Sequence, residues 1–497
     1  MAQMPEIVDA SEIEQSLAAL VAAGPVEVRE NGVRLASLAS FEYEIRAQGR
    51  GTLLHLWSPD RTLARRVLRI SEQAPSLLQL EVEHFGRNKP DRLEFAVSGE
   101  RASTQLTREK FLERFAEMLR EQFVDEEIIS LSTSADLKNS LSSRYTRGLL
   151  KTRDGHWAVL AASPDESAAA IDDMLTFGLL WLENARARAK IGRVHGLRLF
   201  MPPATGKLVA HRAGALAPAT KIEFYELNLA LGRARRVDAK ELGNVVTWLT
   251  ARREVEGILA EAAPEIDAVR KLAPDAITAS VVPGTREVAL RFRGADFARW
   301  QNATIFFGLG DHRRALTHDR QHELEQLVRK LDTYRHPAAR DTAHVQYRMQ
   351  PERWLESQVF DDPSRIDARL DPRFLYTQVP AFTAGDRGVV DLLGVTRGGR
   401  LAILELKANE DIHLVLQAAD YWLRVRCHQQ QDDIQRYGYF PGVKLLSEPP
   451  LLFLVAPAIR FHPATTVILR HLSNEIEVAR VGLAESWRRG LRVALRQ

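Results

Sequence analysis

The chain has 497 residues, of which 45% are hydrophobic and 27% are charged, a balance typical of globular proteins. This length is too great for one hydrophobic core, so we expect two to four domains. The net charge of +3 neither requires nor excludes a nucleic-acid partner, whereas the single cysteine, Cys427, excludes a disulfide framework and a multi-cysteine zinc module.

The sequence contains no segment that we expect to enter or cross a membrane. Its first residues are acidic and lack the apolar run of a signal peptide. No stretch of about 18 apolar residues is present. We therefore expect a cytoplasmic protein that makes no membrane contact.

Residues 1–106 predict a strand-rich α+β module. Residues 52–57, 77–83 and 92–97 alternate in polarity or are rich in residues that favour strands. Residues 62–70 have helical spacing, and Asp60 is available as the cap of that helix. This module carries no catalytic pattern.

Residues 107–335 predict a middle α/β region, and a division into 107–264 and 265–335 is one option. Its first helix, 107–129, places Phe111, Phe115, Leu119 and Phe123 on one stripe that should be core. The other expected elements are helices at 168–189 and 242–263, the second ending at Pro264, and strands at 157–162, 196–201, 221–226, 286–292 and 304–307. Residues 335–340 are expected to form a linker, and no internal repeat stands out.

A basic segment at 138–153 is the first candidate for phosphate contacts. It contains hydroxyl groups and a tyrosine, and its cations are Lys138, Arg144, Arg147, Lys151 and Arg153. Such a composition suits a nucleic-acid backbone. The alternative is a solvated loop that leads into the strand at 157–162.

Residues 336–497 predict a third domain. The expected order is a helix at 351–360, strands at 375–379, 388–395 and 401–408, a helix at 412–428 capped by Asp411, a strand at 451–455, a helix at 465–472 and a strand at 475–480. The apolar strand at 451–455 stands between two helices. This arrangement predicts a mixed sheet with both faces covered.

The hairpin at 388–408 carries charges that its apolar neighbours do not explain. Asp391 lies in the first strand, and Glu405 and Lys407 lie in the second. Residues two apart on a strand share a face, so Glu405 and Lys407 are expected to be neighbours. Because buried charges cost much free energy, the cluster indicates a functional site. The alternative is a buried ion-pair network in an ordinary sheet.

The spacing of these residues resembles that of a known family. Asp391, followed after thirteen residues by Glu405-Leu406-Lys407, is similar to the signature of the PD-(D/E)XK nuclease superfamily. Val390 departs from the family pattern, which often has proline before the aspartate. The resemblance covers about the last 145 residues only.

Three further residues extend the resemblance. Glu356 lies on the leading helix, where many members carry an additional metal-binding acid. Gln417 and Tyr421 resemble the Gln-x-x-x-Tyr pattern of the resolvase-like and repair-endonuclease branches. The implied fold is a restriction-endonuclease-like α/β core, with a mixed central sheet flanked by helices, inside a multidomain chain of α/β and α+β parts.

The resemblance implies a metal-dependent endonuclease that hydrolyses phosphodiester bonds in DNA during repair, recombination or defence. Asp391, Glu405 and the backbone carbonyl of Leu406 would hold Mg²⁺, with Mn²⁺ as a substitute, since these ligands are hard oxygens. The ion would supply Lewis acidity and a water of lowered pKa. Glu356 could complete a second metal position.

The remaining candidates would support that chemistry. Lys407 would orient or deprotonate the attacking water, or offset charge on the phosphate. Gln417 and Tyr421 would hold Lys407, the metal water or the phosphate. The residues expected to grip the nucleic-acid backbone in this domain are Arg387, Arg424 and Lys444.

Two other functions fit the same sequence. A catalytically inactive nuclease fold could serve as a nucleic-acid-binding or scaffold protein, and an RNA nuclease would use the same groups. DNA is the expected partner because the branches that the sequence resembles cut DNA. Paired nicks in two strands generally need two active sites, so we consider a homodimer.

Overall fold

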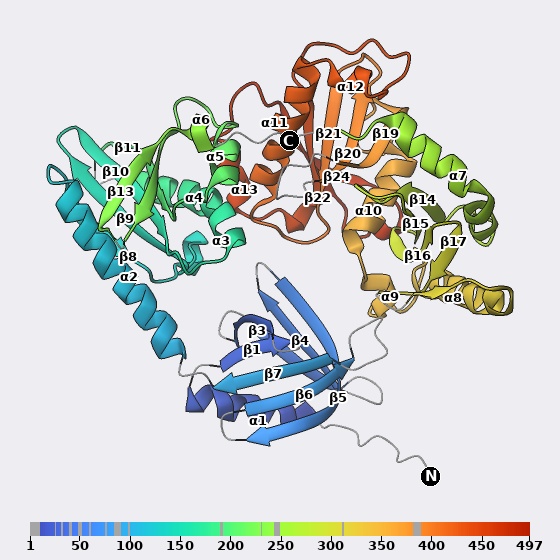
Figure 1. Cartoon of the computed structure of the whole chain (residues 1–497), viewed down its shortest axis with the longest axis horizontal. Coiled ribbons are helices and arrows are strands. Elements are labelled where there is room, and N and C mark those ends of the chain that lie inside the picture. The colour runs from blue at the N-terminus through green and yellow to red at the C-terminus, as the bar shows by residue number, and fades with distance from the viewer. Residues whose placement is uncertain are drawn as a thin grey trace. The chain divides into compact units, whose positions relative to one another are not determined.

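The computed structural model describes residues 10–24, 26–30, 33–38, 42–47, 52–58, 61–74, 77–83, 91–97, 100–188, 192–229, 231–242, 249–310, 313–380 and 389–497. Helices alternate with four sheets along the chain, which is a mixed α/β architecture (Figure 1). The chain divides into two compact units, residues 1–109 with 306–317 and residues 110–305 with 318–497. No helix in the described part of the chain is long and apolar enough to cross a membrane.

The first unit is built on a seven-stranded antiparallel sheet with the order β2-β1-β7-β6-β5-β4-β3. Helix α1 (Ala10–Ala23) packs on it through Ile13, Leu17 and Leu20, which share one helical face. The strands are β1 (Val26–Glu30), β2 (Val33–Ser37), β3 (Glu42–Ala47), β4 (Thr52–Ser58), β5 (Arg61–Ala74), β6 (Leu77–Glu83) and β7 (Asp91–Val97).

The helix expected at 62–70 is wrong. These residues lie inside β5, which pairs with β4 on one side and β6 on the other. Hydrogen bonding to two neighbouring strands outweighs the weak helical spacing of this cation-rich segment. Asp60, the expected cap, lies outside the described residues.

The second unit begins with a six-stranded sheet of order β13-β12-β11-β10-β9-β8. Phe111, Phe115 and Leu119 are buried on α2 with Phe123 beside them, so the predicted core stripe is confirmed. The elements are α2 (Glu100–Gln122), β8 (Glu127–Ser132), β9 (Tyr145–Thr152), β10 (Gly155–Ala162), α3 (Ala168–Asp172), α4 (Met174–Ala187), β11 (Val194–Met201), α5 (Lys207–Ala213), β12 (Lys221–Asn228) and β13 (Arg233–Val237).

Two expectations for this region need correction. The segment 138–153 is a loop only in its first part, because its second half forms β9, the first strand of a tight hairpin with β10. The helix expected at 242–263 is replaced by α6 (Ala239–Leu242) and α7 (Arg252–Arg270), and Pro264 lies inside α7. The apolar face of α7 continues past Pro264 to Ile266 and packs on β14 and β15, which offsets the cost of about 3 kcal/mol for an internal proline.

A small antiparallel sheet of order β14-β15-β16-β17-β18 follows. Its strands are β14 (Ile277–Val281), β15 (Val288–Phe292), β16 (Ala295–Gln301), β17 (Thr304–Phe307) and β18 (Arg314–Ala315), and helices α8 (Gln321–Tyr334) and α9 (Val345–Arg348) come after it. Arg335 directly follows α8 and is completely buried. The expected linker at 335–340 therefore starts with a core residue.

The last sheet is mixed, with the order β19-β20-β21-β22-β23-β24. Strands β19, β20 and β21 are antiparallel, β21, β22 and β23 are parallel, and β24 is antiparallel to β23. The elements are α10 (Pro351–Asp361), β19 (Leu370–Pro380), β20 (Val389–Thr396), β21 (Leu401–Leu406), α11 (Leu414–Gln430), α12 (Asp433–Arg436), β22 (Leu451–Pro457), α13 (Ala464–Leu469), β23 (Val478–Leu483) and β24 (Val493–Arg496). The predicted mixed sheet is confirmed.

Two details differ from expectation in this domain. The last expected strand starts at Val478 rather than 475, and β24 was not predicted. Asp411 does not cap α11, since its carboxylate accepts from the backbone N–H of His413, two residues on.

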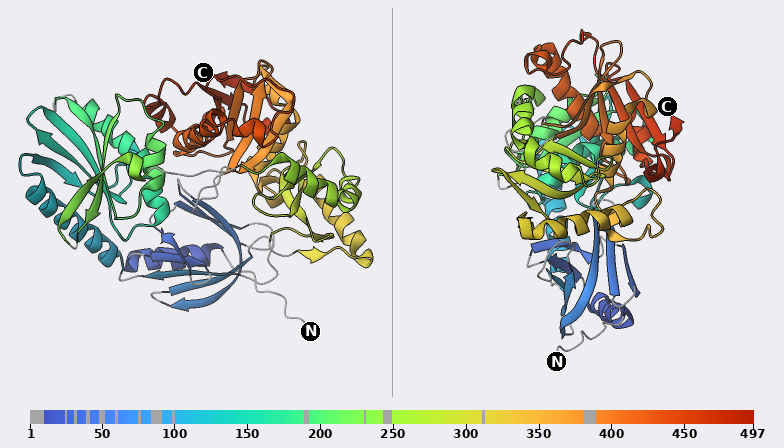
Figure 2. Two further views of the ribbon diagram at one scale, coloured as in Figure 1. Left: turned by 45° about the horizontal axis from the view of Figure 1, so that its top comes forward. Right: turned by 90° about the vertical axis from the view of Figure 1, so that its right-hand side faces the viewer.

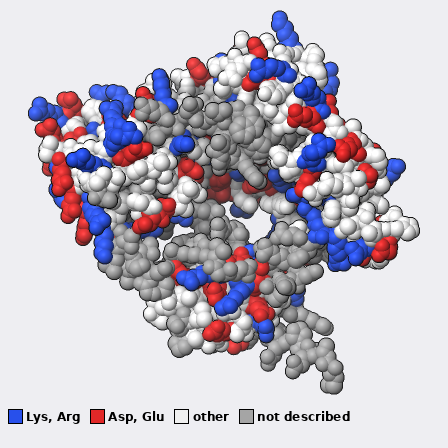
Figure 3. Space-filling view, viewed as in Figure 1, with Lys and Arg blue, Asp and Glu red and all other residues white. Residues whose placement is uncertain are grey.

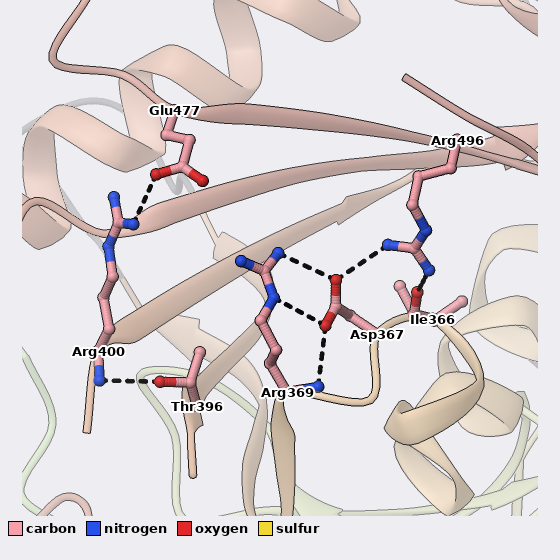
Figure 4. Close-up of polar contacts among 7 residues, drawn as sticks. All are labelled: Ile366, Asp367, Arg369, Thr396, Arg400, Glu477 and Arg496. Carbon is pink, nitrogen blue, oxygen red and sulfur yellow. Dashed lines mark hydrogen bonds and ion pairs between the residues drawn. The ribbon is translucent and has the colours of Figure 1, made fainter. Parts of the chain in front are cut away.

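Ion pairs link segments at the ends of different strands of the last sheet (Figure 4). Asp367 accepts two hydrogen bonds from the Arg369 guanidinium, both at 3.0 Å, and one from Arg496 on β24 at 2.9 Å. Arg400 at the β20–β21 hairpin donates to Glu477 at 2.6 Å. These clusters are paired within the fold and are therefore structural.

Candidate active site

The hairpin of β20 and β21 brings Asp391 and Glu405 together. Leu392 pairs with Leu404 across the hairpin, so Asp391 lies beside the end of β21. Its Oδ2 accepts a hydrogen bond of 3.0 Å from the backbone N–H of Leu406. The predicted grouping of an acid from one strand with an acid from the next is present in the structure.

Glu405 is the most deeply buried carboxylate of this group, with 1% of its surface exposed. Its Oε1 lies 3.5 Å from Lys407 Nζ. Its Oε2 is buried and accepts no hydrogen bond from the described residues. An unsatisfied buried carboxylate oxygen is expensive, so this atom indicates a missing partner such as a cation.

Lys407 lies between two acids. Its Nζ is 3.5 Å from Glu405 Oε1 and 3.3 Å from Asp411 Oδ2. Burial disfavours the ammonium, but Glu405 and Asp411 outweigh burial and raise the pKa of Lys407 above its ordinary value. Lys407 is therefore protonated at neutral pH.

Ionisation of Asp391 and of Glu405 is unfavourable, because both carboxylates are buried close to other acids. Burial, followed by the charge on Glu356, raises the pKa of Asp391 to about 7. Burial, followed by the charge on Asp391, raises the pKa of Glu405 well above its ordinary value. The pair titrates as a coupled system, and a bound cation would favour the fully ionised form.

Glu356 of α10 is buried near Asp391. Its Oε2 accepts hydrogen bonds from Arg353 Nη1 at 2.9 Å and from Gln378 Nε2 at 3.0 Å, and burial raises its pKa. Gln378 has a φ of 53° within β19, a strained conformation for a residue with a side chain. The strained backbone positions an amide that orients the Glu356 carboxylate.

Gln417 and Tyr421 lie one turn apart on α11, as predicted. Gln417 Nε2 donates to Tyr421 Oη at 3.2 Å. Burial and then the charge on Glu405 raise the pKa of Tyr421, so its hydroxyl stays protonated at neutral pH. Tyr421 can therefore serve as a hydrogen-bond donor to the site.

The donor set fits a divalent cation that keeps part of its water shell. Among the residues that the structure describes, no three His, Cys, Asp or Glu side chains form a closed metal cluster. Two carboxylates and the Leu406 carbonyl are nevertheless hard oxygen donors of the kind that Mg²⁺ combines with retained waters. The free Oε2 of Glu405 supports this fit. Glu356 is a weaker candidate ligand, because its Oε2 already accepts two hydrogen bonds.

Several predicted backbone-gripping residues are engaged elsewhere. Arg424 is buried and bonds both oxygens of Asp420, at 2.7 and 2.9 Å, which corrects the expectation that it contacts a phosphate. Arg147 is buried as well, donates to the carbonyls of Ser134 and Ser142, and lies over the Trp181 ring. Neither guanidinium is available to a nucleic acid.

The other candidate cations remain on the surface or outside the described residues. Lys151 pairs with Glu127 at 2.9 Å. Lys138, Arg153 and Lys444 are exposed, Arg144 is half-buried, and Arg387 lies outside the described residues. On the face seen in Figure 3, cations and acids are interspersed, so binding of a polyanion there would depend on local groups.

Sequence reasoning missed four residues of this site. Glu352, one turn before Glu356, acts electrostatically on Glu405 and Lys407, and the i, i+4 spacing on α10 could have revealed it. The others are Asp411, Arg353 and Gln378. No sequence signal identifies Gln378, because its role depends on a local distortion of β19.

Comparison with protein-family models and with curated proteins finds no match to this sequence.

The raised pKa of Asp391 predicts a pH-dependent stability. Without metal, the folded protein retains this proton up to a pH of about 7, whereas the unfolded chain releases it near its ordinary pKa of about 4. Stability should therefore fall as the pH rises from about 4 to about 7. Thermal unfolding in EDTA should show this decline, and Asp391→Asn should make it shallower, since the raised pKa values of Glu405 and Glu356 contribute a decline of the same sign.

The matched control is Asp267→Asn, because Asp267 is largely exposed and pairs only with Arg270 among the contacts described. It should leave the pH profile unchanged. Mg²⁺ should raise the melting temperature more at pH 8 than at pH 5, since ligands must be deprotonated to bind. Superimposable profiles for wild type and Asp391→Asn would contradict the assignment of this proton.

Proposed function

We propose that this protein is a metal-dependent endonuclease that hydrolyses phosphodiester bonds in DNA. One observation carries the proposal: Asp391, Glu405 and Lys407 converge at the end of one hairpin, and a buried oxygen of Glu405 lacks a partner. A structural ion-pair network would be expected to satisfy that oxygen.

The fold around the site supports the proposal. A helix, three antiparallel strands, a helix and a parallel strand follow one another from α10 to β22. This order agrees with the restriction-endonuclease-like core that the resemblance implies. The catalytic groups come from β20 and β21, next to the first parallel strand pair.

Different side chains would bind the metal ion and contact the phosphate. Asp391, Glu405 and the Leu406 carbonyl would hold Mg²⁺, or Mn²⁺ in its place, and the ion would supply Lewis acidity and an acidified water. Lys407, which carries a proton at neutral pH, would act as a cation that offsets charge on the phosphate or orients the attacking water. The protonated state argues against Lys407 as the base.

The supporting groups fix this arrangement. Arg353 and Gln378 hold Glu356 close to Asp391, where its negative charge would favour cation binding. Tyr421, oriented by Gln417, would donate to the phosphate or to a metal-bound water. The choice of DNA rests on the resemblance to DNA-cutting branches of the superfamily.

A panel of end-labelled duplex, single-stranded, branched and mismatched DNAs, with matched RNAs, tests the proposal in Mg²⁺ and in Mn²⁺. We expect metal-dependent cleavage of DNA that Asp391→Ala and Lys407→Ala abolish and that the exposed control Lys330→Ala retains. Cleavage of RNA alone would identify an RNA nuclease. Wild-type protein that binds DNA without cutting any substrate would indicate a scaffold and overturn the proposal.

A further inference from the structure

The second unit contains the same topology twice. The first copy has the order α2, β8, β9, β10, α4, β11, α5, β12 and β13, with the short α3 before α4, and the second copy has the order α10, β19, β20, β21, α11, β22, α13, β23 and β24, with the short α12 before β22. Figure 2 shows the two copies in further views, the first in teal to green and the second in orange to red. Counted from β8 to β13 in the first sheet and from β19 to β24 in the second, the neighbouring strands pair in the same way. The first two pairings are antiparallel, the next two are parallel and the last is antiparallel. A shared order of nine elements indicates duplication of one fold.

The strand registers also correspond. One row across β9, β10, β11 and β12 is Leu149, Ala158, Leu197 and Ile222, and the matching row across β20, β21, β22 and β23 is Leu393, Ile403, Leu452 and Val478. Three residues after the first member of each row, Thr152-Arg153 and Thr396-Arg397 open the hairpin. Five residues after the third member stand Pro202 and Pro457.

The two copies pack on each other with reciprocal contacts. Helix α4 contacts α13, and its counterpart α11 contacts α5, the counterpart of α13. Leu216 and Leu472, at corresponding positions after α5 and α13, form an antiparallel β-bridge. The N–H of Ala217 donates to the carbonyl of His471, and the N–H of Ser473 donates to that of Ala215, both at 2.8 Å.

The two hydrogen bonds are equivalent by symmetry, because Ala217 corresponds to Ser473 and Ala215 to His471. This equivalence is expected for a pseudo-two-fold axis through the bridge. Each copy also contributes a histidine that faces an acid of the other. His211 of α5 lies 3.2 Å from Asp420 of α11, and His471 lies 3.4 Å from Glu183 of α4. Buried apolar residues of both copies form one continuous cluster.

The first copy lacks the groups that we propose to be catalytic in the second. The matched registers place Arg147 where the second copy has Asp391, and Leu160 and Ala162 where it has Glu405 and Lys407. The fourth and eighth residues of the following helix are Phe177 and Trp181 instead of Gln417 and Tyr421. Arg147 lies over Trp181, so a cation and a ring fill the space that acids occupy in the other copy.

We infer that the half from α2 to β13 is a catalytically silent copy, and that one monomeric chain acts as a pseudo-dimer with a single cutting centre. This inference rests on the proposed function. Each event adds one water across one phosphodiester bond: the water oxygen bonds to phosphorus, the bond to the leaving sugar oxygen breaks, and that oxygen gains a proton. The expected product is a nick in one strand, and one chain supplies both halves of the assembly considered above as a homodimer.

Two measurements test this inference. On covalently closed circular DNA carrying a branched site, wild-type protein in Mg²⁺ should produce nicked circles before any linear DNA. Lys407→Met should abolish the product, whereas Ala162→Ser, at the counterpart position of the silent copy, should retain it. Light scattering should give the mass of one chain for the free protein, and the mass of one chain plus the DNA for the complex.

The outcomes separate the inference from the proposed function. Linear DNA as the first product of a monomer, or residual cutting by Lys407→Met, would show a second active centre and overturn the inference. A stable dimer would overturn the single-chain arrangement. If no variant and no wild-type protein cuts any DNA, the proposed function fails, and the measured mass still decides whether one chain forms the pseudo-dimer.

Discussion

Replacing Glu405 with glutamine is expected to reduce metal-dependent cleavage by about 10³-fold, the scale seen when one transition-state-stabilising group is removed from an enzyme. Glutamine keeps the shape of the side chain but removes the charge that would hold a cation. The rate should be measured on a cleaved substrate at saturating Mg²⁺ and neutral pH.

The same substitution should raise the melting temperature of the metal-free protein. Glu405 is 1% exposed, burial raises its pKa, and its Oε2 is unsatisfied, so a neutral amide removes an unfavourable charge. Glu485→Gln, at an exposed acid 3.9 Å from Arg460, is the matched control and should change neither quantity. A lower melting temperature for Glu405→Gln than for wild type would indicate that Glu405 belongs to a structural ion pair instead.

Replacing Arg335 with alanine is expected to cost about 4 kcal/mol of unfolding free energy, as for other buried charged networks that lose one partner. The buried guanidinium donates to the carbonyls of Arg293, Gln346, Met349 and Gln350 and lies 4.6 Å from the Trp354 ring centre. Alanine would leave these carbonyls without their donor.

The effect of this change should extend to the active site. The carbonyls belong to the turn after β15 and to the segment that enters α10, which carries Glu356. Denaturant unfolding measures the loss, and Arg329→Ala, at a highly exposed arginine of α8, is the control expected to change stability by less than about 0.5 kcal/mol. Equal stabilities for the two variants would contradict the role assigned to Arg335.

The core of the candidate site could be predicted from sequence because strand geometry is local. Side chains two residues apart on a strand lie on the same face of the sheet, so Glu405 was expected beside Lys407. A short hairpin brings Asp391 of the preceding strand next to them. The i, i+4 spacing on α11 likewise placed Gln417 against Tyr421.

Features set by tertiary contacts were missed. Pairing with strands on both sides made 61–74 a strand despite its helical spacing, and packing of its apolar face carried α7 through Pro264. Arg424 has the sequence context of an exposed cation but is neutralised by Asp420 in the interior. The duplicated fold was not visible, because the two copies share topology and register but few identical residues.

The most direct test of the nuclease assignment is the rate of Mg²⁺-dependent strand cleavage by wild-type protein and Glu405→Gln, purified in parallel and assayed on the same labelled DNA. We predict cleavage by wild type that stops in EDTA, and cleavage by Glu405→Gln that is lower by about 10³-fold. Equal rates for the two proteins, or no cleavage by wild type on any substrate of the panel, would contradict it.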